Sequence, residues 1–201
     1  MRRKKLRTYI TVSVLAAAMS LGTAFASPGQ FPCAEFDGAK AQQLLEYLQR
    51  DRSALRPECA VLALQGLNHY VPAVKTLIKY LDYAIPGDAM KAPVGVIMRL
   101  PWLGEKFPAF ASLYEIGRPA SNDLVAAIAQ DRTSGIARAN AIQLLFEIYR
   151  DGPSEAVALL RRSGERATDR RSEYLLIDAA RKTADMCRGD EMNRCLNALR
   201  P

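Results

Sequence analysis

Leu113-Tyr-Glu-Ile-Gly-Arg118 and Leu145-Phe-Glu-Ile-Tyr-Arg150 are two six-residue strings that share four identities and begin 32 residues apart. The match continues in a second segment, where three residues correspond at the same offset: Val125, Ala126 and Ile128 with Val157, Ala158 and Leu160. A string repeated at this distance is typical of helical-repeat proteins. The sequence therefore predicts a repeating unit of two helices joined by a turn.

The repeated pattern resembles HEAT-like (armadillo-type) repeats, short helical hairpins in which apolar and small residues recur at fixed positions. The residues that carry the resemblance form two clear copies, Ala109, Ser112, Leu113, Ile116 and Gly117, then Ala141, Leu144, Leu145 and Ile148. Two weaker copies are Leu176, Ile177 and Ala180, and upstream Leu64, Leu67, Val74 and Leu77. The resemblance covers about residues 60–195 and implies a short α-solenoid, although a plain helical bundle could also satisfy the pattern.

The first 26 residues have the layout of a secretory signal peptide. A basic segment, residues 2–7, precedes an apolar run from Tyr9 to Leu21 and a small-residue site at Ala24-Phe-Ala26. We expect cleavage after Ala26 and a periplasmic or extracellular protein without a stable membrane anchor; an uncleaved anchor is the alternative. Cleavage removes five basic residues and no acidic ones, so the formal charge falls from +7 to +2. We therefore expect no nucleic-acid partner.

Four cysteines in an exported chain predict disulfide bonds. Three pairings are possible in principle, and sequence spacing favours Cys33–Cys59 and Cys187–Cys195. A zinc site is the alternative, but no Cys-x-x-Cys occurs and His69 is the single histidine. We expect neither a metal nor a cofactor.

The mature chain is predicted to have an extended tail over residues 27–36 and one all-α domain over 37–201. No segment alternates with a period of two for long enough to predict a strand. Several residues are predicted to begin helices, Asp37, Pro57, Pro72, Pro108, Ser121, Ser134 and either Thr168 or Asp169, and Gly117 to end one. The longest helix is expected after Ser134, and a last short helix over 190–199.

Residues 84–107 form a predicted insert, because prolines and glycines occur too often there for a long helix. The insert is nevertheless apolar and should pack on something. Trp102 and Phe107 are candidate partner-binding residues in a docking loop; filling the core is the other interpretation. In HEAT-like stacks the second helices line the concave side, which adds Lys75, Lys79, Arg161 and Arg162 as candidates for an acidic or mixed partner.

No arrangement of residues identifies a catalytic site. His69 and the pair Glu115 and Glu147 are more simply a turn residue and solvated carboxylates that pair with Arg118 and Arg150. Arg188-Gly-Asp190 is more simply a helix end and a cap than an adhesion motif. We expect a monomeric scaffold for protein–protein interaction in the periplasm or envelope. The alternatives are a helical enzyme acting on an envelope glycan or peptide, and a structural envelope protein without a discrete ligand.

Overall fold

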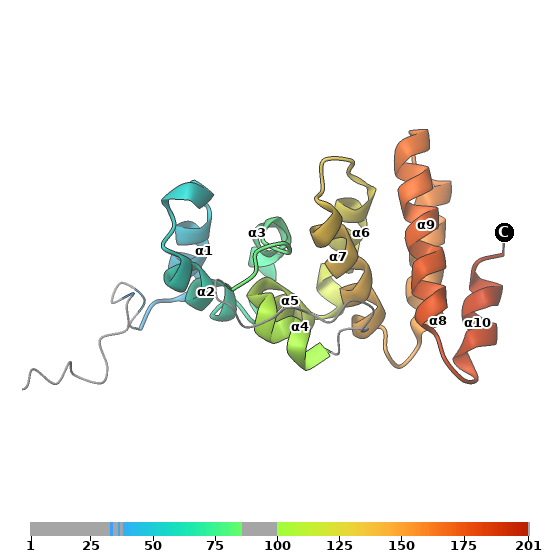
Figure 1. The fold of residues 1–201 in the computed structure, drawn as a ribbon, viewed down its shortest axis with the longest axis horizontal. Coiled ribbons are helices and arrows are strands. Elements are labelled where there is room, and N and C mark those ends of the chain that lie inside the picture. Colours follow the sequence, from blue (N-terminus) through green and yellow to red (C-terminus); the bar gives the residue numbers. More distant parts are fainter. Residues whose placement is uncertain (1–32, 34–35, 37, 86–99, 201) are drawn as a thin grey trace, which may run out of the picture. The chain divides into compact units, whose positions relative to one another are not determined.

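Helices make up the regular structure of the chain (Figure 1). The computed structural model describes Cys33, Phe36, residues 38–85 and residues 100–200, with only the backbone described for 100–102. No strand occurs in these ranges, which confirms the all-α prediction. The predicted signal peptide, most of the predicted tail, Asp37 and residues 86–99 of the insert lie outside the described residues.

The described part contains ten α-helices and three short 3₁₀ helices. In chain order they are α1 (Ala41–Leu48), η2 (Arg52–Ala54), α2 (Pro57–Gln65), η3 (Val71–Ala73), α3 (Val74–Lys79), α4 (Leu100–Lys106), α5 (Pro108–Ile116), η4 (Arg118–Ala120), α6 (Ser121–Ala129), α7 (Gly135–Ile148), α8 (Pro153–Glu165), α9 (Arg170–Met186) and α10 (Glu191–Ala198). All of these elements belong to one compact unit.

Proline begins three of the α-helices. Pro57, Pro108 and Pro153 occupy the first positions of α2, α5 and α8, where the missing N–H costs nothing and the fixed φ suits a helix. The prediction for Pro72 was wrong by a few residues. Pro72 lies in η3, and the α-helix begins only at Val74, because a tighter turn comes first.

Side-chain caps start α7 and α9 as predicted. Ser134 Oγ accepts a 3.1 Å hydrogen bond from the backbone N–H of Ala137, and Asp169 does the same for Ser172 at 2.8 Å. These bonds satisfy N–H groups that have no partner within the helix. Hydrogen bonds from the backbone N–H and then the hydroxyl of Ser172 hold the pKa of the Asp169 carboxyl below its usual range.

The structure corrects two predicted helix boundaries and the prediction of the longest helix. Ser121 is the first residue of α6 rather than its cap, because η4 already turns the chain into the helix. The first helix begins after Lys40, at Ala41, rather than at Asp37. The longest helix among the described residues is α9, with 17 residues, and α7 has 14.

The two six-residue strings end their helices in different ways. Gly117 ends α5 with a φ of 71°, a conformation that residues with a Cβ rarely adopt, and the chain continues into η4. The equivalent Tyr149 ends α7 with an ordinary φ of −103°. The Gly-to-Tyr difference between the strings therefore corresponds to a real difference in backbone conformation.

Equivalent positions of the sequence repeat are buried alike. Leu113 and Leu145 in the first helices, and Ile128 and Leu160 in the second, are all fully buried, as is the upstream Leu64. Burying a side chain of this size contributes about 1.5–3 kcal/mol. The repeated residues therefore form the core of the molecule.

Most of the helices that are equivalent in the sequence repeat contact one another. The first helices contact in sequence, α2 with α5, α5 with α7 and α7 with α9. Among the second helices, α3 contacts α6 and α8 contacts α10, whereas α6 packs mainly on α7 and α9. Helices α8 and α9 pack closely at Gly164, where the absence of a side chain leaves room for Ile177, whose side chain would lie about 3.0 Å from a Cβ at that glycine.

Two buried polar side chains also link helices of different pairs. Ser112 on α5 donates a hydrogen bond to the Leu64 carbonyl, and Asn140 on α7 donates one to the Leu81 carbonyl just after α3. Both bonds satisfy backbone groups that water cannot reach.

The described end of the insert is packed against the core. Helix α4 contacts α5, and Leu103 and Phe107 are 2% and 4% exposed. The backbone N–H of Ile85 donates a 2.9 Å hydrogen bond to the Lys106 carbonyl, which joins the two ends of the insert. Burial assigns Phe107 to the core and removes it from any binding surface, because its ring is covered by the protein itself.

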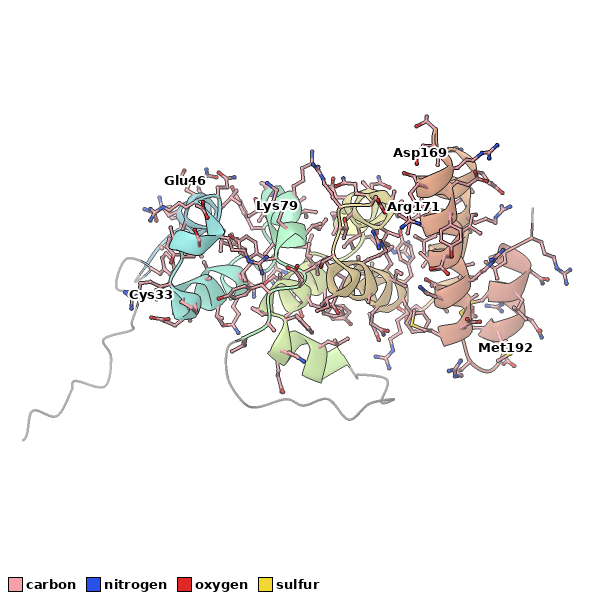
Figure 2. All side chains as sticks on the ribbon, turned by 45° about the horizontal axis from the view of Figure 1, so that its top comes forward. Cys33, Glu46, Lys79, Asp169, Arg171 and Met192 are labelled. Atoms are coloured by element: carbon pink, nitrogen blue, oxygen red, sulfur yellow. A yellow bond between two sulfur atoms is a disulfide. The ribbon has the colours of Figure 1, made fainter. Side chains whose placement is uncertain are left out.

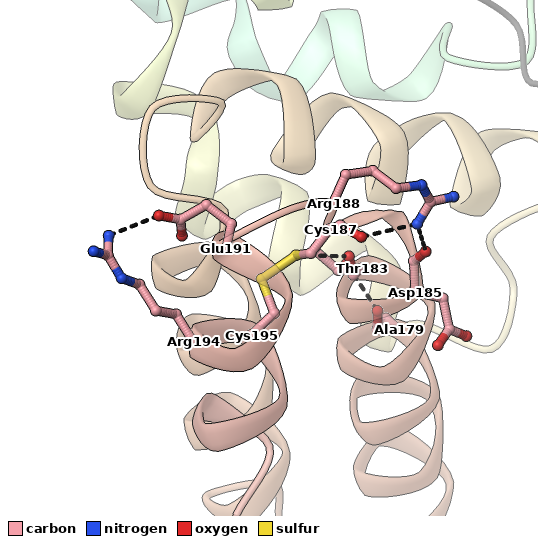
Figure 3. Close-up of a disulfide and its surroundings, with 8 residues drawn as sticks. All are labelled: Ala179, Thr183, Asp185, Cys187, Arg188, Glu191, Arg194 and Cys195. Atoms are coloured by element: carbon pink, nitrogen blue, oxygen red, sulfur yellow. Dashed lines mark hydrogen bonds and ion pairs between the residues drawn. A yellow bond between two sulfur atoms is a disulfide. The ribbon is translucent and has the colours of Figure 1, made fainter.

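Two disulfides connect the cysteines in the predicted pairing. Cys33–Cys59 ties the segment before α1 to α2, with its Cα atoms 5.5 Å apart. Cys187–Cys195 joins the end of α9 to α10, with Cα atoms 6.6 Å apart (Figure 3). Both cysteine pairs are buried.

Candidate functional site

A groove of about 750 Å³ lies between α3, α6 and the loop that precedes α7. Lys75 and Lys79 line it from α3, Asp123 and Ala126 from α6, and Arg132 from the loop. Two of the predicted partner-binding residues therefore lie in one hollow, formed by the second helices of two helix pairs. Figure 2 labels Lys79 at this position on α3.

The sequence of α3 accounts for the position of its two lysines. Val74 and Leu77 are buried in the core, so Lys75 and Lys79 share the opposite, exposed side at a spacing of four residues. Within the described part of the chain neither lysine forms a hydrogen bond or an ion pair. Two cations close together on one helix face repel each other, and an anionic ligand would relieve that repulsion.

Asp82 forms a fixed part of the groove wall. Its Oδ1 lies 3.1 Å from Nη1 of Arg52, and its Oδ2 accepts a 3.0 Å hydrogen bond from the hydroxyl of Ser134. The Arg52 guanidinium also lies over the rings of Tyr80 and Tyr83, 5.2 and 5.1 Å from their centroids. The charge of Asp82 is thus already compensated by the protein.

The loop between α6 and α7 is held by side-chain hydrogen bonds. Thr133 donates from Oγ1 to the Ala127 carbonyl at 2.7 Å. Arg138 donates to the carbonyls of Ile128, at 3.2 Å, and Gln130, at 2.8 Å. These bonds satisfy carbonyl groups at the end of α6, so this wall of the groove is ordered before any ligand binds.

The charge of the groove is positive. Three cations line it, Lys75, Lys79 and Arg132, against the carboxylates of Asp82 and Asp123. Because Asp82 is paired with Arg52, only Asp123 opposes the three cations. The arrangement favours a ligand with several negative charges, and it supplies hydrogen-bond donors.

The two predicted arginines of α8 lie elsewhere. Arg161 has a side chain only 20% exposed and forms a 2.7 Å ion pair with Glu165 on its own helix. Arg162 lines a separate groove of about 590 Å³ between α8 and α10, together with Glu155 and Arg194. The structure therefore divides the four basic candidates between two grooves, and Arg161 is engaged within the protein.

Trp102 belongs to α4, but only its backbone is described, so the structure does not place its side chain.

The residues weighed as catalytic candidates have ordinary surroundings. His69 is exposed in a turn with a φ of 64°. Glu147 accepts a 3.0 Å hydrogen bond from Gln143. Arg118 pairs with Glu155 at 3.2 Å rather than with Glu115, because the turn after Gly117 directs it toward the next helix pair.

The Arg-Gly-Asp sequence is used within the fold. Gly189 has a φ of 57° and precedes α10, as predicted. Arg188 donates from Nη1 to the backbone carbonyls of Asp185 and Cys187, next to the disulfide (Figure 3). Its guanidinium therefore satisfies carbonyl groups at the end of α9. Asp190 precedes α10, but its side chain makes no capping bond, contrary to the prediction.

The chain matches no known protein family, no curated protein and no solved structure. Within the residues that the structure describes, no helix is long and apolar enough to cross a membrane. Over the same ranges, no three acidic, histidine or cysteine side chains are grouped so that they could hold a metal ion.

Sequence reasoning missed Asp82, Asp123 and Arg132 as parts of the groove. Asp82 meets Ser134 across 52 residues, a contact that no local pattern indicates. A signal was present in the loop, where Asp131, Arg132 and Thr133 directly precede the predicted cap of α7. A polar run of this kind next to a cap marks a solvent-facing helix end, where ligands commonly bind.

Proposed function

We propose that this protein is an exported helical-repeat scaffold that binds an acidic segment of a partner protein in the groove between α3 and α6. The observation that carries the proposal is the pair Lys75 and Lys79, which share one helix face without an ion pair in the described part of the chain and lie in a groove with a fixed wall. A carboxylate-bearing segment complements this charge.

A HEAT-like architecture is part of the proposal. It is supported by the matching burial of Leu113 with Leu145 and of Ile128 with Leu160, and by the contacts of α5 with α7 and of α3 with α6. In stacks of helical hairpins, equivalent helices contact those of the next unit. The second helices then form a surface on which an extended ligand can bind.

Export is supported by the two disulfides and by the composition of residues 1–26. Disulfides of this kind persist in oxidising compartments such as the bacterial periplasm. The partner is accordingly expected in the envelope or outside the cell.

The size of the groove favours a short peptide segment over a whole folded surface. Exposed charge pairs contribute only about 0.2–1 kcal/mol each, so an affinity that depends on Lys75 and Lys79 is modest and salt-dependent. At 0.1–0.15 M salt, interactions between charges are screened beyond about 8–10 Å. Binding should therefore weaken measurably as the salt concentration is raised.

The test measures fluorescence anisotropy of a labelled ten-residue Glu-rich peptide with the disulfide-bonded chain from Ser27 onward. We expect saturable binding, and at least a tenfold loss of affinity in Lys75→Glu/Lys79→Glu. The matched control is Arg150→Glu/Arg181→Glu, which changes the net charge equally at exposed arginines outside the groove. Equal losses in both variants, or equal binding of a Gln-rich peptide, would show nonspecific attraction and overturn the proposal.

A further inference from the structure

A second groove, of about 380 Å³, lies on the other side of α6. It is lined by Asn122 and Ala126 from α6 and by Ser163, Arg166 and Thr168 from the end of α8 and the turn into α9. Ala126 also lines the first groove. Ala126, on the exposed side of α6, is therefore the lining residue that the two hollows have in common.

The exposed side of α6 offers little obstruction to a chain that crosses it. Asn122, Ala126 and Ala129 recur at intervals of four and three residues and so lie on one face. Ala126 is exposed, and its methyl group is the whole of its side chain. A bound backbone can approach the helix closely at that point.

The far end of the second groove carries a free cation. Arg166 is exposed and forms no ion pair within the described ranges. The nearby Asp169 is engaged, because its carboxylate accepts the 2.8 Å capping bond from Ser172. Figure 2 labels Lys79 on α3 and Asp169 at the start of α9, and α6 contacts both helices. The lysine pair and Arg166 therefore line different grooves along α6.

We infer that the partner's acidic segment binds in an extended form across α6, with acidic residues at both ends and a small residue over Ala126. This inference rests on the proposed function and adds the course and sequence pattern of the ligand. Packed helices are about 8–10 Å apart, so the course from α3 over α6 to α9 is about 16–20 Å. An extended chain covers that distance with about five or six residues.

The test compares two labelled peptides, a ten-residue peptide with Glu at both ends and Gly-Ser in the centre, and a four-residue Glu peptide that fits one groove. We expect the long peptide to bind at least tenfold more tightly than the short one. Arg166→Glu should weaken binding of the long peptide by at least fivefold and leave the short peptide unchanged. Ala126→Trp should also weaken binding of the long peptide by at least fivefold, because the indole would block the crossing over α6.

The matched control for the tryptophan is Ala54→Trp, at an exposed alanine that lines none of the grooves described above. We expect it to bind both peptides like the parent protein. The inference is overturned if Arg166→Glu and Ala126→Trp leave the long peptide unaffected while Lys75→Glu/Lys79→Glu abolishes binding of both peptides; the proposed function then stands. If Lys75→Glu/Lys79→Glu still binds both peptides like the parent protein, the proposed function itself is overturned. If a sulfated polysaccharide binds more tightly than the long peptide, a peptide ligand is excluded.

Discussion

Asn140 on α7 donates a 2.6 Å hydrogen bond from Nδ2 to the backbone carbonyl of Leu81, which lies 59 residues earlier. Asn140 is 5% exposed, so the bond is made away from water. It fixes the first half of α7 against the segment that follows α3, and Ser134, which meets Asp82 in the groove wall, caps the same helix. A core contact thus positions one side of the candidate binding groove.

We predict that Asn140→Ala lowers the free energy of unfolding by about 1–3 kcal/mol, because it leaves the Leu81 carbonyl buried without a donor. Urea denaturation followed by circular dichroism measures this change. Asn193→Ala, at an exposed position of α10, is the control and should change stability by less than about 0.5 kcal/mol. Equal effects of the two variants would mean that the buried bond contributes nothing specific.

A second prediction compares two buried serines. Ser112 donates to the Leu64 carbonyl, whereas Ser121 Oγ has no hydrogen-bond partner among the described atoms. Ser112→Ala should destabilise the protein by about 1–3 kcal/mol, since a buried carbonyl loses its donor. Ser121→Ala should be neutral or stabilising, because it removes a buried polar group that lacks a partner. Thermal unfolding of both variants tests the difference, and a reversed order would refute it.

The third prediction concerns the end of α5. Gly117 has φ 71° and ψ −141°, a region that residues with a Cβ occupy only at a cost of about 1–3 kcal/mol. Gly117→Ala should lower stability by that amount although no neighbouring side chain blocks the methyl group. Gly135→Ala has equally open surroundings and an ordinary φ, and should not destabilise the protein. Chemical denaturation of the two variants separates backbone strain from loss of space.

The fourth prediction concerns Cys187–Cys195. Replacing both cysteines by alanine should lower the free energy of unfolding by about 2–4 kcal/mol, because the short loop is no longer closed in the unfolded chain. In the folded protein, hydrogen exchange should rise first in α10, which contacts mainly α8 and α9. Exchange measured by mass spectrometry tests this, and a uniform rise over all helices would contradict it.

Local sequence signals predicted much of the fold. Ser134, Asp169 and Gly117 act within three or four residues of their own positions, so capping chemistry and backbone freedom were sufficient to place those helix ends. The prediction that Ser121 caps α6 was wrong, because the 3₁₀ turn before it already leads into the helix. That turn is set by packing rather than by residue type.

The candidate groove was only half predictable. The exposed positions of Lys75 and Lys79 could be predicted from the spacing of the apolar residues on α3, which leaves the lysines on the other face. Asp82, its ion pair with Arg52 and its bond to Ser134 depend on contacts over 30 and 52 residues, which composition and spacing do not encode. For Phe107 the sequence left docking and core filling open, because an apolar ring suits an interface and a core equally well, and the packing of α4 and α5 selects the core.

The two disulfides lie in the first and last parts of the described chain. Fraying in helical arrays starts at such ends, and proteases cleave segments that fray. The disulfides therefore oppose fraying in both of these parts. Their reduction should open the segments around α2 and α10 to proteolysis before the helices between them.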